Sequence, residues 1–180
     1  MADKVKVASD WLAGCAGCHM SFLDIDERIV QLIEKADLTS TPITDLKHPP
    51  ATGVDVGILE GAVNNSTTEK VCRQMRERSK ILIALGDCAC FGGIVTMRNF
   101  VRTEDALRRA YIETESTVDG QIPRHEDLAV MQNARAIDQV VAVDIYIPGC
   151  PPSADAIFYA LSELLAGRKP LLQGKYLDWH

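Results

Sequence analysis

The sequence predicts an α/β protein with a mainly parallel sheet that is covered by helices on both faces. Short apolar runs of strand length alternate with segments in which apolar residues recur at helical spacing. Alternating strands and helices form right-handed βαβ units with parallel strands. Two of the runs, residues 81–85 and 140–147, are almost continuously apolar, as expected for strands buried on both faces. A chain of 180 residues has room for one ordinary domain, so we expect residues 1–180 to form a single one.

Three strands and two helices are predicted in the first half of the chain. The strands are residues 5–8, 38–43 and 54–59. The first helix is predicted to start at Ser21 and Asp24, because apolar residues then follow on one helical face. These apolar residues are Ile25, Ile29, Leu32, Ile33 and Ala36. The second helix should begin at Ser66, where Ser66 and Glu69 have capping-box spacing, and continue to about Ser79.

The second half contains two predicted strands and one clear helix. The strands are residues 81–85 and 140–147. Between them, we predict a less regular insertion with one or two short helices, at about residues 94–133. The last helix should begin at Ser153 and stop at Gly167, since glycine often follows a helix end.

Charge and hydropathy exclude several classes of function. The chain has 19 Lys and Arg against 25 Asp and Glu, a formal charge of −6, which is the wrong sign for binding nucleic acid by counterion release. Its apolar runs are far shorter than the about 18 residues that cross a bilayer, so no membrane association is expected. The first residues show neither an apolar secretory core nor a twin arginine. We therefore expect a cytoplasmic protein.

The six cysteines carry most of the functional information. In a reducing compartment they are core thiols or metal ligands more often than disulfides. Cys72 lies on the apolar face of a predicted helix, where we expect a packed thiol. The other five each follow a predicted strand, at the edge of the sheet where open α/β proteins bind ligands. They are Cys15, Cys18, Cys88, Cys90 and Cys150.

The spacing of Cys15 and Cys18 allows more than one chemistry. Such a pair occurs in redox-active thiol proteins and in zinc knuckles, but a zinc ribbon normally supplies two pairs. Here the further cysteines stand singly in glycine-containing loops, whose N–H groups can donate to cluster sulfurs. Spacing alone thus favours a [4Fe–4S] cluster over zinc. Cys88 is nearer the strand end than Cys90, which we expect to pack under the loop.

Several motifs occur together, in a fixed order, over essentially the whole chain. They are Trp11-Leu12 before Cys15-x-x-Cys18, Glu60-Gly61-Ala62, Gly86-x-Cys88-Ala89 with Gly92-Gly93, and Pro148-Gly149-Cys150-Pro151-Pro152. Each motif alone is weak, but the ordered set is highly specific. On these residues the chain resembles the small subunit of [NiFe] hydrogenases.

The resemblance implies a flavodoxin-like domain that holds one proximal [4Fe–4S] cluster. The four ligands that it implies are Cys15, Cys18, Cys88 and Cys150. Membrane-bound and periplasmic relatives carry a twin-arginine signal and a second domain for two more clusters, which this sequence lacks. The chain therefore looks like the small subunit of the cytoplasmic, NAD-reducing (bidirectional) type.

The same resemblance implies a division of labour between subunits. H2 would be split at a Ni–Fe centre in a partner large subunit. Electrons would then pass through the cluster of this chain to flavin and NAD in a diaphorase module, which has iron–sulfur and flavin subunits. A second FMN near this subunit is left open.

No acid–base pair or nucleophile constellation is evident, so no residue of this chain is predicted to perform bond chemistry. Glu60 could relay protons or hydrogen-bond the backbone of the cluster loop, and a capping or solvated carboxylate is the equal alternative. Many relatives carry Glu immediately before the first ligand cysteine, where this chain has Gly14, so the resemblance does not extend to a proton path there. We expect His19 to be a loop or interface residue rather than a fifth ligand.

Two alternative functions stay open at this point. The first is the quinone-proximal cluster subunit of an NADH dehydrogenase-like complex, which shares the Gly-x-Cys and Gly-Cys-Pro-Pro motifs but has adjacent cysteines at the first site. The second is a flavodoxin-like FMN-binding module with structural zinc, although Cys15 to Cys18 occupy the place of its phosphate loop.

Overall fold

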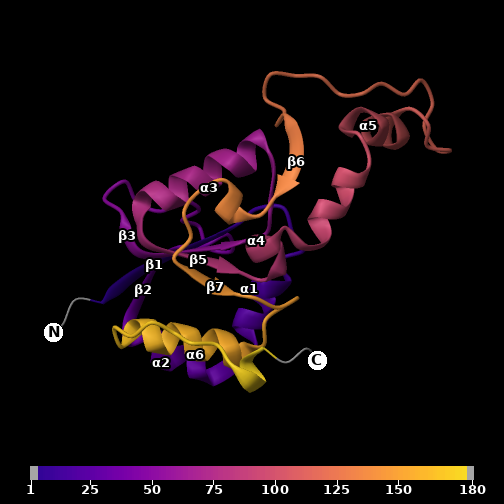
Figure 1. Ribbon diagram of the computed structural model, residues 1–180. Coiled ribbons are helices and arrows are strands. Elements are labelled where there is room, and N and C mark those ends of the chain that lie inside the picture. Colours follow the sequence, from indigo (N-terminus) through magenta and orange to yellow (C-terminus); the bar gives the residue numbers. More distant parts are fainter. Residues whose placement is uncertain (1–3, 178–180) are drawn as a thin grey trace.

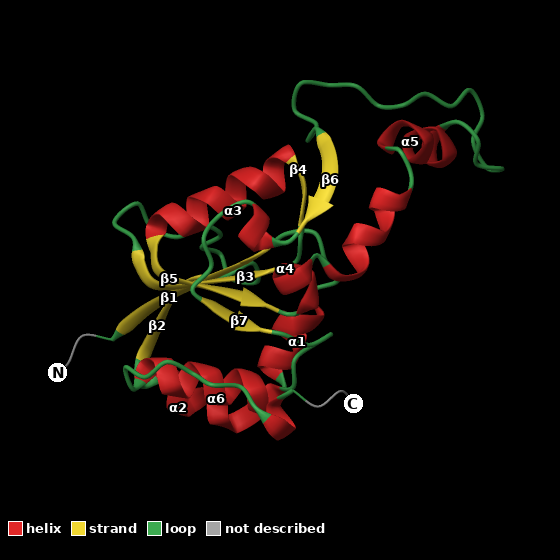
Figure 2. Cartoon of the chain, viewed as in Figure 1, coloured by secondary structure: helices red, strands yellow, loops and turns green. Residues whose placement is uncertain are grey.

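The chain folds around one parallel sheet, which the computed structural model describes for residues 4–177 (Figures 1 and 2). Its strands are β1 (Val5–Trp11), β2 (Ala36–Ser40), β3 (Val54–Glu60), β5 (Ser79–Leu85) and β7 (Ile145–Ile147). They lie in the order β2-β1-β3-β5-β7, and every neighbouring pair is parallel. This is the flavodoxin-like order, so the predicted fold class is confirmed.

Helices cover both faces of the sheet (Figure 1). On one face lie α1 (Gly17–Leu23), α2 (Ile29–Ile33) and α6 (Ala154–Leu165); on the other lies α3 (Ser66–Arg78). Two apolar clusters fill these layers, because successive side chains of each buried strand point to opposite faces. Ile83 packs toward α6, while Leu82 packs toward α3 with Met75.

The predicted helix from Ser21 to Ala36 is wrong as a continuous element. The chain instead forms α1, a 3-10 turn over Asp26–Arg28, and the short α2, and Ala36 already belongs to β2. Asp26 has a φ of 56°, a left-handed conformation that interrupts a right-handed helix. The apolar spacing nevertheless marks burial correctly, since Ile25 and Leu32 are in the core.

The capping box of α3 is displaced by one residue from the prediction. Asn65 is the N-cap, and its side chain accepts a hydrogen bond of 2.9 Å from the N–H of Thr68. Thr68 in turn receives the N–H of Asn65 on its hydroxyl at 3.1 Å. The predicted helix is confirmed, since α3 runs from Ser66 to Arg78. The change of cap is tolerated because Asn caps a helix as well as Ser does.

The other predicted elements differ in how well they hold. The strands at 5–8, 54–59 and 81–85 are confirmed, and so is α6, with Ser153 as its N-cap and Gly167 at a φ of 73° beyond its end. The strand predicted at 38–43 is displaced, since β2 begins at Ala36 and already ends at Ser40. Of the apolar run 140–147, only Ile145–Ile147 pairs in the sheet. Val140, Val141 and Val143 pack against the second core cluster without strand pairing, so their hydrophobicity reports burial alone.

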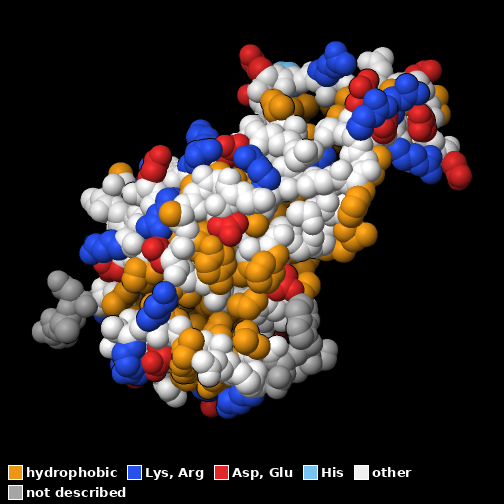
Figure 3. Space-filling model, viewed as in Figure 1, with side chains coloured by type: hydrophobic (Ala, Val, Ile, Leu, Met, Phe, Trp, Pro, Cys, Tyr) orange, Lys and Arg blue, Asp and Glu red, His pale blue; other side chains and the backbone are white. Residues whose placement is uncertain are grey.

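A helical arm projects from the main sheet (Figure 1). It contains a 3-10 segment (Gly93–Phe100) and α5 (Thr103–Tyr111), and it returns through β6 (Met131–Arg135), which pairs antiparallel with β4 (Val63–Asn65). Hydrophobic side chains line the stretch that leads to α5 (Figure 3). Phe100 there is 89% exposed. In the part of the chain from 4 to 177, no helix combines the length and apolarity that crossing a membrane requires.

Candidate metal centre

Four cysteines lie just beyond the carboxyl ends of three strands of the sheet. Cys15 and Cys18 follow β1, Cys88 follows β5 in the short helix α4 (Asp87–Phe91), and Cys150 follows β7. Cys15 and Cys150 are exposed, Cys88 is half-buried and Cys18 is buried. Because β1, β3, β5 and β7 are consecutive parallel strands, their carboxyl ends meet at one edge. The sequence expectation that these cysteines share an edge agrees with this geometry.

Asp87 ties together the two loops that carry Cys88 and Cys150. Its N–H donates to the carbonyl of Gly149 at 2.8 Å, and its Oδ1 accepts the N–H of Gly149 at 2.7 Å. The N–H of Gly86 also bonds the carbonyl of Ile147 at 2.8 Å. These reciprocal bonds, which join residues 62 positions apart, fix the two cysteine loops relative to each other.

Glycines leave room for the sulfur atoms. Gly86 has a φ of 83°, and a Cβ at this position would collide with Sγ of Cys18. Gly93 has a φ of 46°, and a Cβ there would lie 2.9 Å from Sγ of Cys88. Glycine is thus required at both positions for two reasons: the left-handed backbone conformation, and the lack of space for a Cβ beside the cysteine sulfur.

The thiols of the edge influence one another's charge. Burial is the main cause that raises the pKa of Cys18, and the negative charges of Glu60, Cys15, Cys88 and Cys150 raise it further. Burial also raises the pKa of Cys88. Thiolates gathered in this way repel each other, and a bound cationic centre would relieve that repulsion. The edge therefore suits a cationic centre large enough to be reached by several thiolates.

Backbone N–H groups point at two of the sulfurs, as predicted from the glycine-rich loops. Only one of these N–H groups belongs to a glycine. The N–H of Gly17 donates to Sγ of Cys15 at 3.4 Å. Cys88 is approached by the N–H groups of Ile94 and Val95, which oppose the effect of burial on its pKa. Such donors stabilise thiolates and tune bound clusters.

A buried polar chain supports the first cysteine loop from behind. Glu60, the last residue of β3, is 2% exposed and accepts the N–H of Cys18 at 3.2 Å and that of His19 at 2.9 Å. Its Oε2 also meets Nδ1 of His19 at 2.5 Å, and Nε2 of His19 meets Oγ of Ser9 at 3.1 Å. The carboxylate thus holds the beginning of α1, where Cys18 lies, which is the backbone contact that was one of its expected roles. The alternative of a solvated carboxylate is wrong, because the side chain is buried.

The hydrogen bonds of this polar chain also set its protonation. Burial alone would raise the pKa of Glu60, but the hydrogen bonds from His19 and Cys18 outweigh burial and hold the pKa below its usual value. An ionised carboxylate only accepts hydrogen bonds, so Nδ1 of His19 carries the hydrogen. The expectation that His19 is a loop or interface residue is wrong, because it is a buried residue of α1.

Sequence reasoning missed Ser9 and the partnership of His19. The position of Ser9 directly after the apolar residues Val7 and Ala8 of the strand is the one signal that could have pointed to a buried polar group. Its partner could not be identified, because His19 approaches it only through the turn between β1 and α1.

Cys72 and Cys90 lie elsewhere, in the core cluster beneath α3. Cys72 is 0% and Cys90 is 2% exposed, and Sγ of Cys90 bonds the carbonyl of Ala84 at 3.4 Å. Burial raises the pKa of Cys72 to about 11 and that of Cys90 to about 12. The prediction that both are packed thiols is confirmed.

The edge cysteines differ in arrangement from a site for a single ion. Among residues 4–177, no three Cys, His, Asp or Glu side chains come close enough together to hold one metal ion. A single zinc would need sulfurs about 2.3 Å from one centre. In a [4Fe–4S] cluster each thiolate binds a different iron, so the ligands stand farther apart. Four thiols from three loops, with amide donors at Cys15 and Cys88, match the four-thiolate ligation of such a cluster.

The matching family pattern is that of the NADH ubiquinone oxidoreductase 20 Kd subunit, which covers residues 15–164. This chain belongs to that family of oxidoreductase-complex subunits. Within it, the chain is 40% identical over 169 residues to subunit delta of the NAD-reducing hydrogenase HoxS of Cupriavidus necator. The match covers 92% of this chain and 80% of that subunit.

Solved structures agree with this relationship. A chain of an NAD+-reducing [NiFe]-hydrogenase in the H2-reduced state superposes with a TM-score of 0.94 at 36% identity, covering 99% of this chain and 100% of that one. A chain of the [NiFeSe]-hydrogenase of Dm. baculatum, 18% identical, has a TM-score of 0.60 and shares the fold. The chain is thus similar to a subunit of NAD-reducing hydrogenases over nearly its whole length.

Other relatives are longer. A subunit of the F420-non-reducing hydrogenase of Methanothermobacter thermautotrophicus is 34% identical over 172 residues, which cover 94% of this chain but only 56% of that protein. The chain therefore spans about half the length of this relative. The family pattern itself runs through all four edge cysteines, from Cys15 to Cys150.

Proposed function

We propose that this chain is the electron-transfer small subunit of a cytoplasmic NAD-reducing [NiFe] hydrogenase. The observation that carries the proposal is the gathering of four cysteines from three separate loops at one edge of the sheet. The similarity to subunit delta of HoxS over 92% of the chain supports the same conclusion. A quinone-proximal subunit would belong to the same family, but this similarity favours the hydrogenase.

The proposed ligands of one [4Fe–4S] cluster are Cys15, Cys18, Cys88 and Cys150. When bound, such a cluster accepts and releases single electrons. The residues around it have separate tasks. Gly86 and Gly93 keep space for two of the sulfurs, Asp87 holds two of the loops together, and Glu60 fixes the amide of Cys18.

Glu60 is also the candidate proton relay of this chain. Its carboxylate already receives hydrogen bonds from Cys18 and His19, which support a positioning role. Gly14 lies beside it, since a Cβ on Gly14 would be 3.9 Å from Oε1 of Glu60. A relay through Glu60 would therefore start from a buried, already bonded carboxylate.

The proposed partners are a large subunit with the Ni–Fe centre and a diaphorase module with iron–sulfur and flavin subunits. Exposed apolar side chains near the cysteines support a protein interface there. Phe91 is 66% exposed directly after Cys90, and the arm adds Ile94, Met97 and Phe100. Whether FMN binds near this subunit is a separate question that flavin analysis answers.

Metal analysis of the complex tests the proposal. The chain should be purified anaerobically with its partners, and iron and acid-labile sulfide should then be measured, with about four of each assigned to this chain. Nickel should be found in a co-purifying larger subunit. Zinc in place of iron would overturn the cluster, and a complex without nickel but with quinone reductase activity would favour the NADH dehydrogenase alternative.

A further inference from the structure

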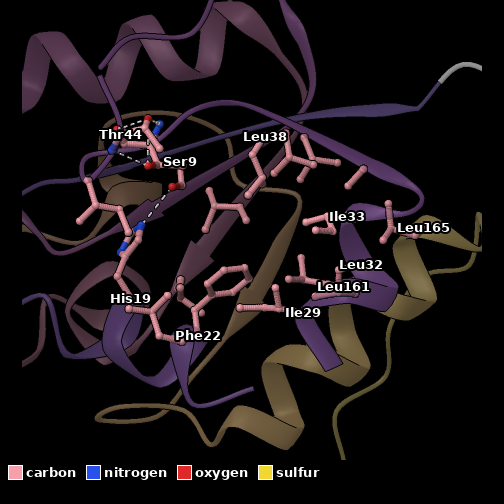
Figure 4. A pocket seen from close by; sticks show the side chains of 18 of the residues that line it. Ser9, His19, Phe22, Ile29, Leu32, Ile33, Leu38, Thr44, Leu161 and Leu165 are labelled. Atoms are coloured by element: carbon pink, nitrogen blue, oxygen red, sulfur yellow. Dashed lines mark hydrogen bonds between the residues drawn. The ribbon is translucent and has the colours of Figure 1, made fainter. Parts of the chain in front are cut away.

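A cavity of about 280 Å³ lies between the sheet and the helices α1, α2 and α6, and no cysteine lines it (Figure 4). Val7, Val56 and Ile58 form its wall on the sheet. Phe22, Ile29 and Leu32 of the broken helical segment, with Leu161 and Leu165 of α6, form the opposite wall.

The chemistry of the lining is almost purely apolar. None of the residues that line the cavity is Asp, Glu, Lys or Arg. Polar groups occur only at one end, where Ser9 bonds His19 and where Thr41 and Thr44 bond each other at 3.2 Å (Figure 4). These polar groups have partners within the protein, so they do not demand a charged ligand.

The entrance is apolar as well. Ile33 is 41% exposed, and Leu23, Leu38 and Ile43 are also exposed while lining the cavity. A charged molecule entering here would lose its hydration without gaining a counter-ion, which is strongly unfavourable. An uncharged apolar molecule would meet no such cost.

We propose that this cavity binds a small, uncharged, mainly apolar molecule. An apolar cavity of about 150 Å³ stays dry and binds benzene or xenon, so a cavity of about 280 Å³ has room for a molecule of roughly twice the volume of benzene. Ligand sites in proteins are typically apolar with few polar groups at one end, as here. Ser9 is the group that a single hydroxyl of the ligand could meet.

The site is separate from the proposed cluster but is connected to it. His19 lines the cavity and bonds Glu60, and Glu60 accepts the N–H of Cys18. The proposal itself rests only on the cavity, so it stands or fails independently of iron content.

Binding of toluene to the anaerobically purified complex tests the proposal. We expect toluene to bind at one site per copy of this chain in calorimetric titration, and benzoate, which adds a carboxylate to a similar ring, to bind at least tenfold more weakly. A crystal of the complex under xenon should show xenon among Val7, Ile58 and Leu161. No toluene site on this chain, or a partner side chain seated in the cavity, would overturn the proposal.

Cavity-filling variants localise the site. Ala36→Leu places additional methyl groups in the cavity and should weaken toluene binding at least tenfold. Ala51→Leu adds the same atoms at an exposed position that does not line the cavity and should leave binding unchanged. If Ala36→Leu does not fold, Ile33→Trp at the entrance replaces it. Unchanged binding in whichever cavity variant folds would overturn the assignment.

Discussion

The six cysteines lie in two regions, the carboxyl edge of the sheet and the core beneath α3. Comparing the two regions shows what makes a thiol a candidate ligand. At the carboxyl edge of the sheet, Cys15, Cys88 and Cys150 are at least partly exposed and Cys18 is buried beside them. Beneath α3, Cys72 and Cys90 are fully enclosed by apolar side chains. The residue type is the same, so the difference comes from where the backbone puts each side chain. Cys72 lies inside the packed helix α3, whereas Cys88 and Cys90 share the short helix α4 and only Cys90 is buried in the core.

The environment of the two groups differs in polarity as well. The edge thiols have amide donors and glycines that leave space at the sulfur. The core thiols meet mainly aliphatic groups, and burial is the main cause that raises their pKa values. The edge therefore suits a charged group, whereas the core suits a small hydrophobe.

Loss of an edge cysteine should have the largest effect. Cys150→Ser should remove a thiolate from the cluster and abolish H2-driven NAD reduction, while diaphorase activity with artificial acceptors persists. We would measure H2-driven NAD reduction, diaphorase activity and the iron content of the variant complex. Loss of both activities would contradict a relay role for this chain.

A substitution at Gly86 should act on the same site without changing a sulfur. Gly86→Ala forces a Cβ into Sγ of Cys18 at a φ of 83°, so iron content should fall severalfold. Gly167→Ala is the matched control, because its φ is 73° but no atom lies within 4 Å of its Cβ position. It should keep its iron and lose about 1 kcal/mol of stability. Equal iron in both variants would show that space at Cys18 is not limiting.

Removal of a core thiol should affect stability only. Cys72→Ala leaves a small cavity beneath α3 and should lower the free energy of unfolding by about 1–3 kcal/mol. Iron content and electron transfer should match the wild type. A lost cluster signal would mean that the division between edge and core cysteines is wrong.

The smallest expected effect concerns the partly exposed ion pair of Arg76 in α3 with Asp144, the residue before β7. Burial opposes ionisation of Asp144, but the N–H of Leu82 and the guanidinium of Arg76 outweigh it and lower its pKa below the usual 3.8. A lowered pKa contributes stability that is present above pH 3.8 and is lost as the pH falls through the folded-state pKa. Asp144→Asn should therefore be less stable than wild type at pH 7.

The stability difference between Asp144→Asn and wild type should shrink below about pH 3.8. Chemical denaturation from pH 7 to pH 3 measures this difference. Iron binding at pH 7 should be unaffected in the variant, because Asp144 precedes β7 and the edge cysteines lie beyond the opposite ends of the strands. A difference that grows on acidification would contradict a lowered pKa of Asp144.

Much of the fold followed from local pattern. Apolar runs of strand length marked β3 and β5, and Ser153 with Gly167 marked both ends of α6. The position of the cysteines after strands was enough to predict a common edge, because parallel strands end on the same side. Predictions were wrong where hydrophobicity reported burial rather than conformation, as in the segment from Ser21 to Ala36 and in the run before Ile145.

The sequence by itself determined the alternation of strands and helices, the family motifs and the cysteines that follow strand ends. Tertiary structure alone decided that the His19 side chain pairs with Glu60, that Asp87 joins the loops of Cys88 and Cys150, and that a cavity opens beside α2. The reason is physical. Periodicity and capping act within a few residues, whereas these contacts join residues 41 to 62 positions apart and depend on the path of the whole backbone.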